Sequence, residues 1–115
     1  MAKILIVEDH AEFRDLLVRI VASTGNKVVA VANGEEAYAD LMQETFDLVI
    51  TDYNLGGAIN GKAVAEIAGR TPVILMSLDE DNLKNPGENV RKTFLKPFKQ
   101  RELAEAISKI LQGRP

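Results

Sequence analysis

Five short apolar runs constrain the fold of this chain more than any other feature of the sequence. Within each run, Val, Ile, Leu or Phe residues follow one another with almost no interruption by charged ones. This pattern is typical of strands that helices cover on both faces of a parallel sheet. We therefore predict strands at residues 4–7, 28–31, 46–50, 73–76 and 94–95.

Segments with the apolar spacing of amphipathic helices separate the predicted strands. The clearest has apolar side chains at positions 13, 16, 17, 20 and 21, and Gly25 just beyond them as a terminator. Asn33 lies three positions before Glu36, which favours the start of a second helix, in which Met42 is expected to fill the core. Further helices are predicted at about residues 62–69 and 103–111.

The segment between Ser77 and Arg91 has few large apolar residues, and Pro86-Gly87 would break a helix there. We expect one or two helical turns followed by a loop. The alternation of strands and helices implies a three-layer α/β fold, with helices on both faces of a doubly wound, five-stranded parallel sheet of order 2-1-3-4-5. Its fourth helix should be short or irregular. A length of 115 residues fits one domain, residues 1–115.

Composition and charge exclude several classes of protein. The chain has 17 acidic and 14 basic side chains, and its Lys and Arg residues are scattered, so we expect no direct binding to nucleic acid. The absence of Cys excludes disulfides, thiolate metal sites and thiol nucleophiles. The N-terminus turns acidic too early for a signal peptide, and the apolar runs are too short to span a membrane. These features predict a cytoplasmic protein.

Polar side chains gather at the carboxyl ends of the predicted strands. Glu8 and Asp9 follow the first strand, Asp52 the third, Ser77 the fourth and Lys96 the fifth. In a sheet of this order, ligands bind between strands 1 and 3, outside their carboxyl ends. Three carboxylates this close resist ionising together unless a cation holds them, and their oxygens suit Mg²⁺. The sequence therefore predicts an acidic Mg²⁺ site with a lysine charge and a serine hydroxyl beside it.

Each of these residues has a plainer interpretation when it is taken alone. An acidic pair is more often a solvated loop or a helix cap, and a single serine or lysine at a strand end is usually structural. His10, the sole histidine, is expected to open the first helix. The joint placement of the five polar residues at one edge of the sheet is what favours a functional site.

Four segments resemble the receiver domains of two-component response regulators, which have a flavodoxin-like fold similar to that of chemotaxis regulators. They are ILIVED at residues 4–9, LVITDYNL at 48–55, VILMS at 73–77 and FLKPF at 94–98. The resemblance covers nearly the whole chain and requires given residue types at given strand ends. It implies a phosphoprotein of a phosphorelay that switches its binding to other proteins and is no enzyme beyond its own phosphorylation and dephosphorylation.

The resemblance assigns a role to each residue of the predicted site. Asp52 would take a phosphoryl group from a histidine kinase, a phosphotransfer protein or a small donor such as acetyl phosphate. Lys96 and Ser77 would bond the transferred group, and the Lys96-Pro97 peptide bond would be cis. Mg²⁺ would be held by Asp9, Asp52 and the backbone carbonyl of Asn54, with Glu8 reaching it through water. The phosphorylated domain would then bind a downstream protein target.

The chain departs from the family pattern at two places. Most receivers have an aromatic residue three positions before the lysine, where this chain has Thr93, and Phe94 should point the opposite way into the core. The loop after Asp52 has Gly56 where a proline is common, which should make it more flexible. Both differences bear on how a phosphoryl group would switch the domain.

Three other functions remain open from the sequence. A degenerate receiver would act as an interaction module that needs no phosphorylation. The shortened segment from Ser77 to Lys96, where the family usually has the fourth helix of its output face, favours this reading. A small Mg²⁺-dependent phosphohydrolase would share the aspartyl-phosphate chemistry, but the chain offers no cap or long loop to build a substrate pocket. A flavin or nucleotide carrier fits least, because Glu8 and Asp9 would repel a phosphate where a glycine-rich loop should hold it.

Overall fold

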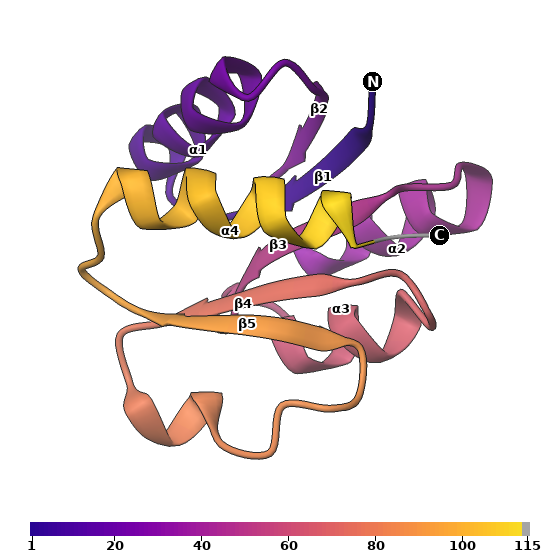
Figure 1. The fold of residues 1–115 in the computed structure, drawn as a ribbon. Helices are drawn as coiled ribbons and strands as arrows, with labels where there is room; N and C mark the ends of the chain where they lie inside the picture. The colour runs from indigo at the N-terminus through magenta and orange to yellow at the C-terminus, as the bar shows by residue number, and fades with distance from the viewer. Residues whose placement is uncertain (114–115) are drawn as a thin grey trace.

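A computed structural model describes residues 1–113 and shows strands and helices in strict alternation (Figure 1). A short 3-10 helix, η1, stands in place of an α-helix between the last two strands. The elements are β1 Lys3–Val7, α1 Ala11–Ser23, β2 Lys27–Val31, α2 Gly34–Gln43, β3 Leu48–Asp52, α3 Gly61–Ile67, β4 Val73–Ser77, η1 Glu80–Leu83, β5 Val90–Leu95 and α4 Gln100–Gln112. The expected short helix followed by a loop before the last strand is confirmed.

The strands form one parallel sheet in the order β2-β1-β3-β4-β5, as predicted. Because all of the strands run in the same direction, their carboxyl ends meet at one edge. Figure 1 shows this for β4 and β5, which lie side by side, with η1 close to their carboxyl ends. The winding direction of the chain reverses between β1 and β3, which are neighbours.

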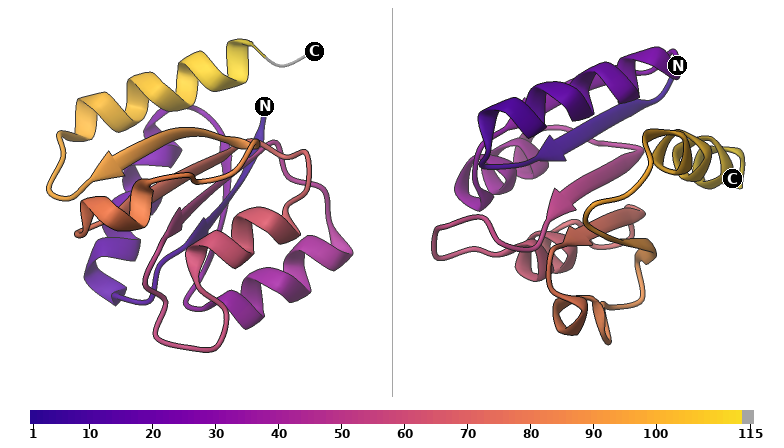
Figure 2. Two further views of the ribbon diagram at one scale, coloured as in Figure 1. Left: turned by 90° about the horizontal axis from the view of Figure 1, so that it is seen from below. Right: turned by 90° about the vertical axis from the view of Figure 1, so that its left-hand side faces the viewer.

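Each face of the sheet has its own core, because successive side chains of a strand point to opposite faces. Ile4 and Ile6 pack on the face covered by α1 and α4, whereas Leu5 and Val7 pack on the face covered by α2 and α3. We call these the α1–α4 face and the α2–α3 face. Both views in Figure 2 place α2 and α3 across the sheet from α4. The inner strands are fully buried, which explains their continuous apolar sequence.

Two strand boundaries and one core residue differ from the predictions. The third strand begins at Leu48, and Phe46 is buried just before it. The fifth begins at Val90 instead of Phe94. Met42 is 59% exposed, because Leu41 takes the inward position of α2 and the next residue turns away from the core.

Phe94 points into the α1–α4 face, as expected from strand alternation. The Lys96-Pro97 peptide bond is cis. Within residues 1–113, no helix has the length and apolar character needed to cross a membrane.

Candidate functional site

The sheet brings the predicted polar residues to one edge. Glu8 and Asp9 directly follow β1, Asp52 and Ser77 are the last residues of β3 and β4, and Lys96 follows β5. Glu8, Asp52 and Ser77 are buried, whereas Asp9 is exposed. The site is thus an acidic cluster in which two carboxylates are buried and one is exposed.

Lys96 is the cation at the centre of this site. Its Nζ lies 2.8 Å from Asp52 Oδ1 and 3.2 Å from Glu8 Oε1. The lysine side chain is only 15% exposed, and its Nζ lies 4.3 Å from the centre of the Phe13 ring, a favourable cation–π position. One ammonium group therefore serves two buried carboxylates and is fixed by an aromatic ring from α1.

The carboxyl group of Glu8 has a raised pKa. Burial raises the pKa of its carboxyl group above the ordinary 4.5, and the neighbouring Asp52 carboxylate adds to the rise. The hydrogen bond donated by the His10 backbone N–H and the charge of Lys96 act in the opposite direction. The site thus resists holding all of its negative charge without a further cation.

The carboxylates meet the requirements of a hard metal ion. Glu8, Asp9 and Asp52 each offer one oxygen, and these atoms all lie within 4.8 Å of one another. An all-oxygen donor set with one exposed member suits Mg²⁺, which keeps several water ligands. Asn54 lies two residues beyond Asp52, in the exposed loop that follows β3. The donor set therefore fits the ion that the sequence predicts.

A glycine at the start of α3 fixes the backbone at the end of β3. The Gly61 N–H donates to the Tyr53 carbonyl at 2.8 Å, and Asn60 caps the helix by accepting from the Ala63 N–H. A Cβ atom on Gly61 would lie 2.2 Å from the carbonyl oxygen of Asp52. Helix α3 can start this close to β3 only because residue 61 has no side chain. The sequence interpretation gave this glycine no role.

Ser77 belongs to a different hydrogen-bond group from the carboxylates. Its Oγ accepts from the Asp79 backbone N–H at 3.0 Å and from the Asn82 Nδ2 at 3.1 Å. The structure therefore brings Glu8, Asp9, Asp52 and Lys96 together, while the Ser77 hydroxyl contacts the η1 segment. The contacts of Phe13 and Asn82 were not anticipated, because each joins residues that no sequence motif links.

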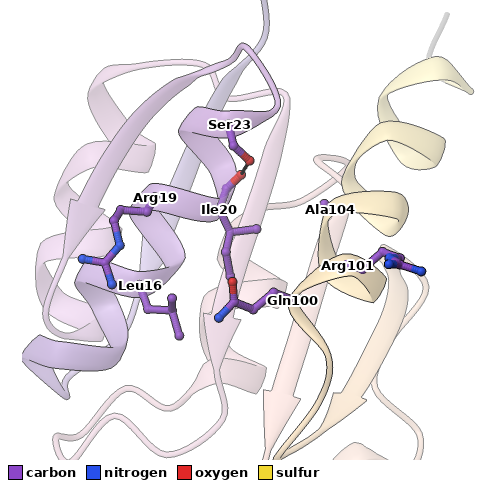
Figure 3. Close-up of a pocket in the computed structure, with 7 residues that line it drawn as sticks. All are labelled: Leu16, Arg19, Ile20, Ser23, Gln100, Arg101 and Ala104. Atoms are coloured by element: carbon purple, nitrogen blue, oxygen red, sulfur yellow. Dashed lines mark hydrogen bonds between the residues drawn. The ribbon is translucent and has the colours of Figure 1, made fainter.

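A shallow surface groove runs along the α1–α4 face beside the site. One part, of about 330 Å³, is lined by Phe13, Leu78, Lys96, Pro97 and Phe98. An adjoining part of about 320 Å³ lies between α1 and α4, and the two share Leu16, Ile20 and Gln100. Figure 3 shows Ile20 and Gln100 pointing toward one another across this second part. Lys96 lines the groove and also pairs with Glu8 and Asp52, so the groove ends beside the acidic site.

His10 is the N-cap of α1, where its Nδ1 accepts from the Phe13 backbone N–H at 3.3 Å. This is the structural role expected for it. Arg14, one turn further along α1, donates to the backbone carbonyl of Glu8 at 2.9 Å. The start of α1 thus holds the acidic turn that follows β1.

Comparisons with known proteins agree with this architecture. VirG of Rhizobium rhizogenes, a regulatory protein, is 28% identical over 121 residues, covering the whole chain and 50% of VirG. The response regulator receiver protein CpdR of Brucella abortus is 29% identical over 117 residues, covering 96% of this chain and 98% of CpdR. This chain therefore spans half the length of VirG and nearly all of CpdR.

The fold is shared with solved receiver structures. The response regulator TrrA of Thermotoga maritima, solved in complex with Mg²⁺ and BeF, superimposes with a TM-score of 0.84 at 29% identity, covering 96% of this chain and 99% of TrrA. The family model of the response regulator receiver domain matches residues 4–108. Because this match takes in almost the whole chain and the fold agrees with it, the chain belongs to the receiver domains of two-component response regulators.

Proposed function

We propose that this receiver accepts a phosphoryl group on Asp52 and that the modified domain changes its binding to a downstream protein. The observation that carries the proposal is the Asp52 carboxylate, buried beside two further carboxylates and paired at 2.8 Å with Lys96. A structural ion pair would need one carboxylate, whereas here one ammonium pairs with two carboxylates and a third lies within 4.8 Å of them. Such an excess of negative charge is typical of a site built to hold a metal ion and a charged substrate group.

The transfer needs one nucleophile and little other covalent chemistry. An oxygen of Asp52 attacks phosphorus, the bond between phosphorus and the donor breaks, and the donor atom keeps the electron pair of that bond. The product is an acyl phosphate on Asp52. Lys96, already in contact with this carboxylate, lies where it can pair with an oxygen of the incoming group. Catalysis of such transfers rests mainly on positioning and charge neutralisation.

The same residues are proposed to hold Mg²⁺. Asp9, Asp52 and the backbone carbonyl of Asn54 would bind it directly, and Glu8 through a water molecule. The ion would supply positive charge to the oxygens of the phosphoryl group. Glu8 also holds Lys96 through its Oε1, so that the lysine stays at the site before any ligand arrives. Asp9, the exposed member, leaves the mouth of the site open.

We propose that a histidine kinase or phosphotransfer protein docks on the groove that opens onto Lys96. A protein donor must cover the surface around Asp52 while its phosphohistidine reaches the acid. The groove next to the site is mainly apolar, and Leu78, which lines it, is 75% exposed. The apolar lining of the groove together with exposed Leu78 gives a protein donor a continuous apolar surface to contact.

The test is the intact mass of the protein after incubation with acetyl phosphate or phosphoramidate, with and without Mg²⁺. We expect one Mg²⁺-dependent phosphoryl adduct, which is lost in Asp52→Asn and kept in Asp40→Asn, a control outside the site. If no donor gives an adduct although Mg²⁺ binds, the phosphoacceptor proposal is wrong. That result would favour the alternative function, an interaction module that works without phosphorylation.

A further inference from the structure

The hydroxyl of Ser77 is held by the segment that follows it. Ser77 is fully buried, and its Oγ accepts two hydrogen bonds, from the Asp79 backbone N–H at 3.0 Å and from Asn82 Nδ2 at 3.1 Å. A serine oxygen has two acceptor positions, and both are in use. The first bond comes from a residue two positions away, whereas the second comes from a side chain of η1.

The η1 segment is a small unit folded around this hydroxyl. The Asp79 side chain accepts from the Asp81 backbone N–H at 2.9 Å, and the Asp79 carbonyl accepts from the Asn82 N–H at 3.1 Å. These bonds shape the turn, but they are local. The bond between Asn82 and Ser77 is the one that ties the side chains of this turn to the carboxyl end of β4.

The side chain that the neighbouring strand places opposite Ser77 is that of Leu95, which has no group that could hydrogen-bond the hydroxyl. Thr93 pairs with Leu75 in the sheet, and Phe94 points to the opposite face. A change in the orientation of the Ser77 hydroxyl would therefore act first on η1, through the hydrogen bond with Asn82. Only a 3-10 helix of four residues and a loop connect β4 to β5, and a segment this short has little internal structure to resist movement.

We propose that Asn82 is a positioning residue that holds the Ser77 hydroxyl in the orientation of the unmodified domain and competes for it with a phosphoryl group on Asp52. This inference rests on the proposed function. When Ser77 turns its oxygen toward the phosphoryl group, the bond to Asn82 is broken and η1 is released. The hydrogen bond between Asn82 and Ser77 exists only in the unmodified state. A change that weakens this bond therefore favours the phosphorylated state by the same free energy.

The test uses beryllium fluoride with Mg²⁺ as a mimic of the phosphoryl group on Asp52, and measures its apparent affinity by titration. One hydrogen bond of this kind contributes a net effect of roughly twofold to tenfold in an equilibrium. We therefore expect Asn82→Ala to bind the mimic roughly twofold to tenfold more tightly than the wild type. Asn82→Leu removes the same donor at similar volume and should shift the affinity in the same direction.

A mutant cycle separates positioning from a general loosening of the loop. In a Ser77→Ala background the hydroxyl is gone, so Asn82→Ala should leave the affinity unchanged within about twofold. Lys84→Ala, which removes the ion pair with Asp81 in the same segment, is the matched control and should have no effect. Hydrogen exchange of residues 78–89 should rise on binding of the mimic in the wild type.

Equal effects of Asn82→Ala with and without Ser77, or a weaker affinity in Asn82→Ala and Asn82→Leu, would overturn the inference. If the wild type gains the Asp52 adduct but the cycle shows no coupling between Asn82 and Ser77, the role proposed for Asn82 is wrong and the proposed function stands. If the wild type shows neither an adduct nor binding of the mimic, the proposed function falls, and the role of Asn82 falls with it.

Discussion

Replacing Gly61 by Ala tests how the fold positions Asp52. The added methyl carbon would lie 2.2 Å from the Asp52 carbonyl oxygen and 2.7 Å from the Tyr53 Cα. Both neighbours are backbone atoms, so that no side chain can rotate to relieve the contact. Either α3 moves away from β3, or the end of β3 shifts. Forcing extra volume into a packed site costs about 1–3 kcal/mol, and here we expect a loss of about 2 kcal/mol or more in the free energy of unfolding.

The assay is urea denaturation followed by circular dichroism. With a slope of about 1.5 kcal/mol per molar urea, a loss of 2 kcal/mol lowers the midpoint by roughly 1.3 M. The geometry of the site should also change, because a shift of the Asp52 backbone moves its carboxylate away from Lys96. We therefore expect slower labelling by acetyl phosphate in the folded variant.

Gly113→Ala is the matched control for this substitution. Its added carbon meets nothing closer than 3.7 Å, and the residue has a helical backbone conformation. It should leave both the midpoint and the labelling rate unchanged. If Gly61→Ala were as stable as this control and labelled at the wild-type rate, the close packing of α3 on β3 would be refuted.

Three further predictions concern the charges and the groove. Lys96→Met leaves the buried Glu8 and Asp52 carboxylates without their cation and should cost about 3–5 kcal/mol in metal-free buffer; a loss below about 1 kcal/mol in urea denaturation would contradict the ion-pair geometry. The raised pKa of Glu8 means that its stabilising protonated form is lost as pH rises above 4.5. In metal-free buffer the wild type should therefore lose stability relative to Glu8→Gln as the pH rises above 4.5 toward the raised pKa, and a constant difference would count against this burial effect. Leu78→Ser should slow transfer from a phosphorylated phosphotransfer protein that labels the wild type by about tenfold and leave labelling by acetyl phosphate unchanged, whereas equal slowing of both would argue against docking at the groove.

The site could be predicted from the sequence because parallel topology makes distant residues neighbours. Glu8 and Asp52 are far apart in the chain, yet each lies at the carboxyl end of a strand whose apolar run is unmistakable. Once the order of β1 and β3 is inferred, the carboxylates must meet. The lysine follows by the same argument from β5, and the ion pairs at 2.8 and 3.2 Å agree with it.

The boundary of β5 was wrong for an identifiable physical reason. The strand lies at the edge of the sheet, and exposed Arg91 and Lys92 resemble a loop in sequence. The register shifts at Val73 and Ile74, so that Val90 packs on the α2–α3 face whereas Phe94 packs on the α1–α4 face. A regular strand would place these two residues on the same face. No periodicity could reveal a strand with such a bulge.

The contacts of Ser77 lay beyond sequence reasoning for a different reason. Asn82 is five positions away in a segment without periodicity, and its role depends on the direction in which one amide group points. Likewise, the apolar spacing of α1 shows that Phe13 faces inward, but it cannot show that its ring lies under the Lys96 ammonium. Sequence patterns predict which elements form and where they lie. They do not determine single side-chain contacts between them.

The charges of the site explain why a serine hydroxyl should respond to phosphorylation. The three carboxylates and one ammonium of the site leave two net negative charges when all are ionised, and a divalent cation would cancel them. A phosphoryl group on Asp52 replaces a single charge with nearly two, so that the balance becomes negative again. Lys96 already serves this site, and β4, the neighbour of β3 in the sheet, ends in the Ser77 hydroxyl, an uncharged donor. Phosphorylation would thus create a demand for a donor, which Ser77 can meet by leaving its bonds to Asn82 and to the Asp79 N–H. The strength of the Asn82 bond should therefore affect how readily the domain switches.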